Sequence, residues 1–421
     1  MTRLSISLIP VVLLILLLAG SCVKDPSPPS GQEGKAFNFI VTEQQRQHIN
    51  SSRGEQYEIS DPLPRLDYGG SEYTIDRFEI RGDNTLNFER KGFGVNMGDK
   101  IILYNRFSGT ERKYEEFKLL AMVYDYTYIE NSVATGLLRE AELWPVLSFF
   151  NEVRLNGRTQ GLYHFIEDPV EYFIERENSS CVVRRGYDHA IKSFDINPVQ
   201  LQNEGLYRAR FRNIYNILPE YSGQQLFDSL SAYIDLEQYF TKLSIDLLLK
   251  NGDYTDEIFF YSKVKDGKEM FGVFPWDYDD LFSDEPHEIG NWWATGTVFG
   301  SRKYSSVEDV VADVGNKLLF SVEDDLDYII AKDEYIYQKY LLTLKSVMEK
   351  VDMNRIDMIF DMTLEDIGPF YDNDSIIAQA KYDVQATSRS LFLDNLARKR
   401  QMLKDRRNWI SGEIDSRKNF K

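Results

Sequence analysis

The sequence predicts an α+β protein with an antiparallel, β-rich N-terminal half and a mostly helical C-terminal half. Residues 36–195 contain alternating or β-rich stretches, and an Asn156-Gly157 dipeptide between two such runs is a strong hairpin signal. From about residue 204 the apolar residues instead recur at helical spacing. We therefore expect a β-rich lobe over residues 36–195 and a helical lobe over residues 196–421.

The 421-residue chain is acidic and has enough apolar residues to build a core. Hydrophobic residues make up 43% of it, which excludes global disorder. The formal net charge of −18 argues against nucleic acid as a partner, because neutralising phosphates needs a basic face. Most of this charge is expected on a solvated surface, and a cluster of carboxylates within it would suit a divalent cation.

Residues 1–21 have the pattern of a secretory signal. Arg3 precedes an apolar run over residues 8–18, and small residues then lead directly to Cys22. The segment resembles a bacterial lipoprotein signal, which implies a lipid anchor on Cys22 and a location in the cell envelope; an ordinary signal peptide or a retained anchor is the alternative. Residues 22–35 are rich in Pro, Ser and Gly and are expected to form a flexible tether.

Cysteine and histidine indicate no catalytic chemistry. Apart from Cys22, Cys181 is the only cysteine, and it lies in a strand-like stretch that lacks a nearby His–Asn pattern. A buried structural cysteine is therefore expected there rather than a nucleophile. The four histidines never occur at metal-ligand spacing, so the sequence does not predict a zinc site.

An amphipathic helix is expected to begin after Asp235. Asp235 suits the N-cap position, and Gln238 stands three residues later, as in a capping box. The apolar stripe of this helix stops at Asn251-Gly252, which is a typical helix end. Asp253 therefore lies just beyond the C-terminus of the helix.

An antiparallel hairpin is expected directly after this helix. The β-rich segments EIFFYSKV and EMFGVFPW flank the turn dipeptide Asp266-Gly267. In a hairpin the start of the first strand lies opposite the end of the second. This pairing would gather carboxylates at one rim, namely Asp253, Asp256, Glu257, Asp277, Asp279 and Asp280.

Such a cluster of carboxylates favours a metal site. Like charges close together raise each other's pKa, and a hard divalent cation with oxygen ligands relieves the repulsion. Mg²⁺, or Mn²⁺, fits one or two carboxylates plus a substrate phosphate. The alternative is an exposed acidic loop whose side chains point into water.

The order of these parts is also that of protein kinases. There one Asp orients the substrate hydroxyl and another, beyond a hairpin, binds Mg²⁺. The usual HRD and DFG signatures are absent from this chain. The layout is therefore similar although the motifs differ.

Over residues 65–411 the chain resembles the CotH (spore-coat protein H) kinases, an atypical kinase-like family. Four segments carry the resemblance in the family's order: YGGSEYTIDRFEIRGDNTLNFERKGFGV, FNEVRLNGRTQGLYHFIED, NGDYTDEIFFY and FPWDYDDLF. The resemblance implies an atypical protein-kinase-like fold. It also implies Mg²⁺-dependent transfer of the γ-phosphate of ATP to a hydroxyl of a protein substrate.

The resemblance assigns roles to individual positions. Asp253 matches the catalytic Asp that orients or deprotonates the acceptor hydroxyl. Asp277 and Asp279 match the metal-binding pair, and Glu257 is a further metal ligand. The candidates for contacting the nucleotide are Arg81, Lys91, Arg184 or Arg185, and Glu167, which would orient one of the basic groups.

Two other functions stay open from the sequence. Glu257 stands where the family usually has Asn, and the added charge beside the phosphates favours a weakened or inactive, pseudokinase-like binding lipoprotein. Asp277-Tyr278-Asp279 also matches the Asp-x-Asp motif of nucleotide-sugar glycosyltransferases, although that class normally shows an alternating parallel βα pattern, which is not seen here.

Overall fold

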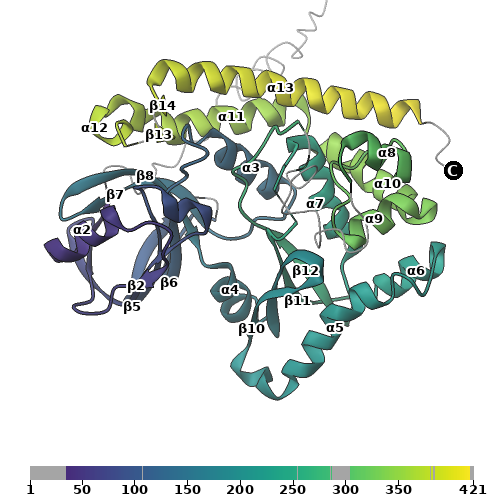
Figure 1. Ribbon diagram of the computed structural model, residues 1–421, viewed down its shortest axis with the longest axis horizontal. Coiled ribbons are helices and arrows are strands. Elements are labelled where there is room, and N and C mark those ends of the chain that lie inside the picture. Colours follow the sequence, from purple (N-terminus) through teal and green to yellow (C-terminus); the bar gives the residue numbers. More distant parts are fainter. Residues whose placement is uncertain are drawn as a thin grey trace, which may run out of the picture. The chain divides into compact units, whose positions relative to one another are not determined.

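The computed structural model describes residues 35–106, 108–253, 255–284, 286, 304–379, 381–382 and 385–417 (Figure 1). The expected signal segment, Cys22 and nearly all of the tether lie outside the described residues. Within the described part, residues 102–113 form one compact unit, and residues 35–101 and 114–417 form the other. All of the candidate site lies in the second unit.

The N-terminal half is built around a sheet that closes on itself. Its strands follow the order β2-β4-β3-β1-β7-β8-β6-β5, and β4 also pairs with β5, so that seven of the eight strands form a ring. The elements of this half are β1 (Phe37–Ile40), α2 (Glu43–Ser51), β2 (Tyr57–Glu58), β3 (Arg65–Tyr68), β4 (Ser71–Arg81), η1 (Asn84–Asn87), β5 (Gly92–Asn105), β6 (Thr110–Leu120), α3 (Ile129–Glu140), β7 (Ser148–Leu155) and β8 (Arg158–Glu167).

The predicted hairpin at Asn156-Gly157 is confirmed. Both residues have positive φ, at 52° and 75°, and they join β7 to β8 in antiparallel register. The expectation of antiparallel pairing does not hold throughout, because β1 runs parallel to β7. That pairing joins residues more than a hundred positions apart, for which the local sequence carries no signal.

Aromatic side chains fill the inside of the closed sheet. The ring centroid of Phe37 lies 5.6 Å from that of Phe165, and the ring of Phe39 lies 4.8 Å from that of Phe78. Phe78 in turn packs 5.1 Å from Phe93 on β5. Because all of these side chains are excluded from water, the closed sheet is a rigid support for the residues at the ends of its strands.

The rest of the chain is mostly helical, as predicted for residues 196–421, with one small sheet of four strands and a two-stranded ladder, β13–β14. Its elements are α4 (Pro169–Glu171), η2 (Tyr172–Arg176), β9 (Cys181–Arg185), η3 (Tyr187–His189), β10 (Ile191–Ile196), η4 (Pro198–Asn203), α5 (Glu204–Asn216), α6 (Gly223–Leu230), α7 (Leu236–Leu249), β11 (Ile258–Lys265), β12 (Lys268–Pro275), α8 (Val307–Val314), α9 (Asp325–Lys332), α10 (Glu334–Lys350), α11 (Met353–Ile367), η5 (Gly368–Asp372), α12 (Asp374–Ile377), β13 (Lys381–Tyr382), β14 (Gln385–Ala386) and α13 (Arg389–Ser416).

The small sheet has the order β10-β9-β11-β12. The hairpin β11–β12 turns at Asp266-Gly267, as predicted, and β9 adds to its free side. Cys181, at the start of β9, is a free and fully buried thiol, also as predicted. A boundary between residues 195 and 196 passes through this sheet, because its strands come from both sides of that point.

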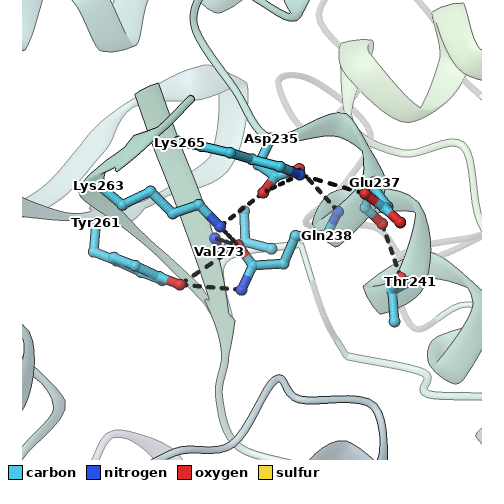
Figure 2. A network of polar contacts seen from close by, with 8 residues as sticks. All are labelled: Asp235, Glu237, Gln238, Thr241, Tyr261, Lys263, Lys265 and Val273. Atoms are coloured by element: carbon cyan, nitrogen blue, oxygen red, sulfur yellow. Dashed lines mark hydrogen bonds and ion pairs between the residues drawn. The ribbon is translucent and has the colours of Figure 1, made fainter. Parts of the chain in front are cut away.

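A polar network ties the first turn of α7 to the hairpin (Figure 2). Asp235 is the N-cap residue, as predicted, and its side chain accepts a hydrogen bond from the backbone N–H of Gln238. Lys263 Nζ lies 2.7 Å from one oxygen of Asp235, and Lys265 Nζ lies 3.0 Å from the other. Gln238 donates to the hydroxyl of Tyr261 at 3.1 Å. The N-terminal end of α7 is therefore fixed to the turn end of β11–β12.

The long helices pack around α7. The last helix, α13, contacts α11, α10, α7 and α3, and Figure 1 shows it running along α11. Their apolar faces join one buried cluster that also includes the small sheet. Among the described residues, no helix is both long enough and apolar enough to cross a membrane.

Candidate functional site

The site lies at the open end of the hairpin, opposite its turn. Ile258 pairs with Pro275, and the N–H of Trp276 donates to the carbonyl of Glu257 at 2.9 Å, so the ladder continues one residue past β12. This is the register that the sequence predicted from the turn. It places Glu257 beside Trp276, with Asp277 next along the chain.

The loop after α7 is hydrogen-bonded to the loop after β12. The N–H of Gly252 donates to the carbonyl of Asp280 at 2.9 Å, and the N–H of Phe282 donates to the carbonyl of Leu249 at 2.9 Å. A Cβ at Gly252 would collide with the side chains of Asp280 and Ser283, so the two loops approach closely at this glycine. The predicted proximity of the Asp253 loop and the Asp279–Asp280 segment is therefore confirmed.

The helix end differs slightly from the prediction. α7 stops at Leu249, and Lys250, rather than Gly252, adopts the left-handed conformation with φ of 53°. Asp277 also has a left-handed backbone, with φ of 51°. Left-handed residues other than glycine carry strain and are concentrated at functional sites.

The carboxylates of this region raise one another's pKa. Burial raises the pKa of Asp277 to about 6; the charge of Arg184 opposes this shift and that of Asp253 adds to it. Burial, followed by the charges of Asp277 and Asp253, raises the pKa of Asp279 well above its usual range. Burial likewise raises the pKa of Glu257, against the effect of Arg184. The four groups therefore share one electrostatic environment.

The carboxylates are neighbours without forming a closed ligand shell. Within the described ranges, the one group of three acidic oxygens that lie within 4.8 Å of one another is Glu115, Glu171 and Glu175, not the Asp253 cluster. Two carboxylates, with water and substrate phosphate completing the shell, are the usual protein contribution to a Mg²⁺ site. Asp277 and Asp279 fit that requirement, because they are partly buried and close enough to repel each other.

Cationic side chains border the cluster. Arg184, on β9, lies 2.5 Å from Glu257 through Nη2 and donates through Nε to the carbonyl of Asp256 at 3.2 Å. Arg81, at the end of β4, is half-buried. Burial lowers its pKa, and the charges of Asp168 and Asp277 oppose this shift. Within the part of the chain that the structure describes, the guanidinium of Arg81 makes neither a hydrogen bond nor an ion pair.

Lys118 is a further basic group that sequence reasoning missed. Its Nζ lies 2.8 Å from Asp168 Oδ2 and 5.1 Å from the ring centroid of Trp276. Burial lowers the pKa of Lys118; the charge of Asp168 opposes this, whereas those of Arg81 and Arg184 add to it. The only sequence signal was indirect, since Asp168 directly follows Glu167, which the family resemblance had singled out.

Two residues expected at the nucleotide have other partners. Lys91 is almost fully buried, and its Nζ donates to the carbonyls of Leu86 and Phe88, each at 2.5 Å. Glu167 is also buried, and its carboxylate lies 2.8 Å from Arg176 Nε and accepts the N–H of Leu147 at 3.0 Å. None of these contacts of Lys91 and Glu167 involves a residue of the acidic cluster.

Arg185, the alternative to Arg184, supports the site from behind. It is fully buried and forms an ion pair with Asp324 at 3.1 Å. Its Nε donates to the carbonyl of Thr255 at 2.8 Å, and the Thr255 hydroxyl donates to Glu323 at 3.0 Å. Arg185 therefore fixes the loop that leads to Glu257, while Arg184 faces the carboxylates.

Helices from both halves hold the loop after β12. Glu130, on α3, accepts the N–H of Leu281 at 3.2 Å and pairs with Lys399 of α13. Arg406 of α13 donates through both Nε and Nη2 to the carbonyl of Leu247, each at 3.2 Å. The last helix thus contacts α7 directly and reaches the loop after β12 through Glu130.

Comparison with known proteins identifies the family. A search of curated proteins finds no match for this chain. A family model described as CotH kinase protein matches residues 78–410, from β4 to the last third of α13. The match includes the strands from the end of β4 to β8, the hairpin β11–β12 and every candidate catalytic, nucleotide-binding and metal-binding residue. The resemblance seen in the sequence is thereby confirmed, and the chain belongs to the CotH kinase family.

Proposed function

We propose that this protein is a Mg²⁺-dependent kinase that transfers the γ-phosphoryl group of ATP to a hydroxyl of a protein substrate. One observation carries the proposal: four mutually repelling carboxylates lie beside Arg81, Lys118 and Arg184. That arrangement matches what phosphoryl transfer requires, a cation site next to a site for phosphates. Family membership and a β-rich half joined to a helical half support an atypical kinase-like fold.

In this proposal Asp277 and Asp279 hold the metal ion. Both carboxylates are partly buried, and burial, together with the charges of neighbouring carboxylates, raises the pKa of each. Bound Mg²⁺ would supply that charge and neutralise the phosphates. Glu257 is the third candidate ligand, and its ion pair with Arg184 links the metal side of the site to the basic side.

The basic groups provide the phosphate contacts. Arg81 has no ion pair among the described residues, so its guanidinium is available to an anion. Lys118 and Arg184 already bind carboxylates, and a nucleotide would share these cations with Asp168 and Glu257. Lys118 replaces Lys91 as the lysine that we assign to this role.

Asp253 acts on the acceptor. Its carboxylate orients the incoming hydroxyl and takes its proton as the oxygen attacks the γ-phosphorus. The bond from that phosphorus to the bridging oxygen breaks, and ADP leaves with the electron pair. The charge of Asp253 raises the pKa of Asp277 and Asp279, which supports its placement beside the metal pair.

The test is transfer of labelled phosphate from ATP by purified protein with and without Mg²⁺. Asp253→Ala should lower the rate by about 100-fold or more. The matched control is Asp284→Ala, which removes a fully exposed carboxylate from the loop after β12 and should leave the rate unchanged. Undiminished transfer in a folded Asp253→Ala protein would overturn the assignment.

Glu257 favours a second candidate, a non-catalytic binding protein. Its carboxylate holds Arg184 at 2.5 Å and adds negative charge where phosphates would lie. Thermal unfolding with ATP and Mg²⁺ separates the outcomes. Stabilisation together with label transfer supports the kinase, stabilisation alone supports a nucleotide-binding pseudokinase, and no stabilisation supports a module that binds neither.

We also infer a place for the protein in the cell envelope, from the lipoprotein-type segment that ends at Cys22. The expected result is incorporation of labelled fatty acid into the wild-type protein and none into Cys22→Ser. Equal labelling of both proteins would contradict a lipid anchor at this residue.

A further inference from the structure

Tyr278, the middle residue of Asp277-Tyr278-Asp279, points away from solvent. It is only 2% exposed, and its hydroxyl donates to Asp246 Oδ1 at 2.8 Å. Asp246 lies on α7, one turn before the end of that helix. The side chain between the two metal-binding candidates is therefore anchored in the helix that precedes Asp253.

Asp246 also holds the other acidic segment. Its carbonyl accepts the N–H of Asn251 at 3.1 Å, and its carboxylate accepts the side-chain amide of Asn251 at 3.4 Å. Asn251 is fully buried and stands two residues before Asp253. One carboxylate therefore receives hydrogen bonds from both loops of the site.

Burying the charge of Asp246 costs free energy, and packing alone does not require a charged residue at this position. Asp246 is 1% exposed, and its other oxygen lies 2.8 Å from Lys242 Nζ, which is fully buried one turn earlier on α7. A well-packed apolar pair is often as stable as a buried ion pair. What the ion pair adds is a fixed, strongly accepting carboxylate to which both loops are hydrogen-bonded.

We propose that Asp246 is a positioning residue, which through Tyr278 and Asn251 sets the spacing between Asp253 and the Asp277–Asp279 pair. The inference rests on the proposed function, because that spacing matters only if the carboxylates bind a cation and an acceptor together. Residues that orient metal ligands affect affinity almost as strongly as the ligands themselves.

The test uses Tyr278→Phe, which removes only the hydroxyl. Its matched control is Tyr340→Phe, since Tyr340 is also fully buried and its hydroxyl donates to the carbonyl of Leu318 at 2.7 Å rather than to Asp246. Each variant loses one buried hydrogen bond. Terbium ion, with luminescence sensitised by the neighbouring Trp276 and competed by Mg²⁺, measures metal affinity independently of enzyme activity.

We expect Tyr278→Phe to raise the Kd for terbium and for Mg²⁺ by about tenfold or more. Tyr340→Phe should change both constants by less than about twofold. Its thermal unfolding temperature should nevertheless fall about as far as that of Tyr278→Phe, because each variant loses one buried hydrogen bond. The variants then differ in metal affinity and not in stability, which a merely structural role for the Tyr278 hydroxyl would not produce.

The failures are distinguishable. If the wild-type protein binds no terbium, the proposed function fails and this inference fails with it. If the wild type binds terbium and Tyr278→Phe has the same Kd as Tyr340→Phe, only the positioning role of Asp246 is overturned. Should Tyr278→Phe not fold, Asn251→Ala removes the second hydrogen bond to the Asp246 carboxylate, and an unchanged Kd in that variant overturns the inference equally.

Discussion

The two ends of α7 face the same hairpin in opposite electrostatic states. At the N-terminal end, burial raises the pKa of Asp235, but hydrogen bonds from Lys263 and Lys265 outweigh burial and lower it below its usual value (Figure 2). At the C-terminal end, burial and neighbouring carboxylates raise the pKa of Asp277 to about 6 and that of Asp279 further.

This difference separates structure from function. The chain provides two lysines for one carboxylate at the first end, so the charges there are satisfied within the protein. At the second end it places several carboxylates together and directs its nearest arginine to Glu257. Unbalanced buried charge of this kind is characteristic of sites that bind or react. The first end should therefore determine stability and the second activity.

The largest effect is expected from a substitution in the acidic cluster at the C-terminal end of α7. On the proposed function, Asp279→Asn should lower Mg²⁺-dependent phosphoryl transfer by about 1,000-fold, because it removes a proposed ligand of the metal that would neutralise the phosphates. Removing metal from the wild type with a chelator should do the same. The control is Asp235→Asn at the first end, which should transfer phosphate at nearly the wild-type rate. Equal losses in both variants would remove the distinction between the ends.

Metal binding should appear as added stability. A cation that binds only the folded protein at 100 times its Kd raises the free energy of unfolding by about 2.7 kcal/mol. Thermal unfolding with and without Mg²⁺ should show this gain in the wild type and in Asp235→Asn, but not in Asp279→Asn. Without metal, Asp279→Asn should be at least as stable as the wild type, since it relieves repulsion with Asp277.

Gly252 tests how closely the two loops must approach. Gly252→Ala should cost about 1–3 kcal/mol in the free energy of unfolding, because its Cβ would collide with Asp280 and Ser283. Gly205→Ala, on the exposed face of α5, has no heavy atom near its Cβ and should be neutral or stabilising by about 0.5–1 kcal/mol. Chemical denaturation measures both changes, and a Gly252→Ala protein as stable as the wild type would show that the close approach of the loops does not constrain this position.

The smallest effect belongs to the first end and depends on pH. Asp235→Asn keeps a capping side chain but loses the ion pairs with partly exposed lysines, which should cost about 0.5–1 kcal/mol at pH 7. Because the pKa of Asp235 is lowered from 3.8, its contribution is present above pH 3.8 and is lost as the pH falls through the lowered value. The stabilities of the two proteins should therefore converge as the pH falls below the lowered pKa of Asp235.

Local signals in the sequence predicted much of the site. Asp266-Gly267 fixed the hairpin register, and that register brought Glu257 beside Trp276 as expected. Asp235 was recognisable as a cap because capping chemistry involves residues only three positions apart. The family resemblance linked these pieces, and the family match confirms it.

The remaining features depend on contacts between distant parts of the chain. Lys118 meets Asp168 only because β6 and β8 are adjacent strands of the closed sheet. Lys91 looked equally available in the sequence, but the turn before it folds back and offers two carbonyls to its amine. The role of Asp246 had no signal in the sequence, since only the fold turns Tyr278 inward to meet its carboxylate.

The contacts of α13 have a consequence for the order in which the protein is completed. Arg406 reaches the carbonyl of Leu247 across 159 positions of the chain, and Lys399 reaches Glu130 across 269. During synthesis the segments bearing the acidic cluster emerge long before the helix that braces them. The nascent chain thus carries all its acidic site residues before it can hold them in place, and the proposed kinase activity would begin only after the last helix has docked.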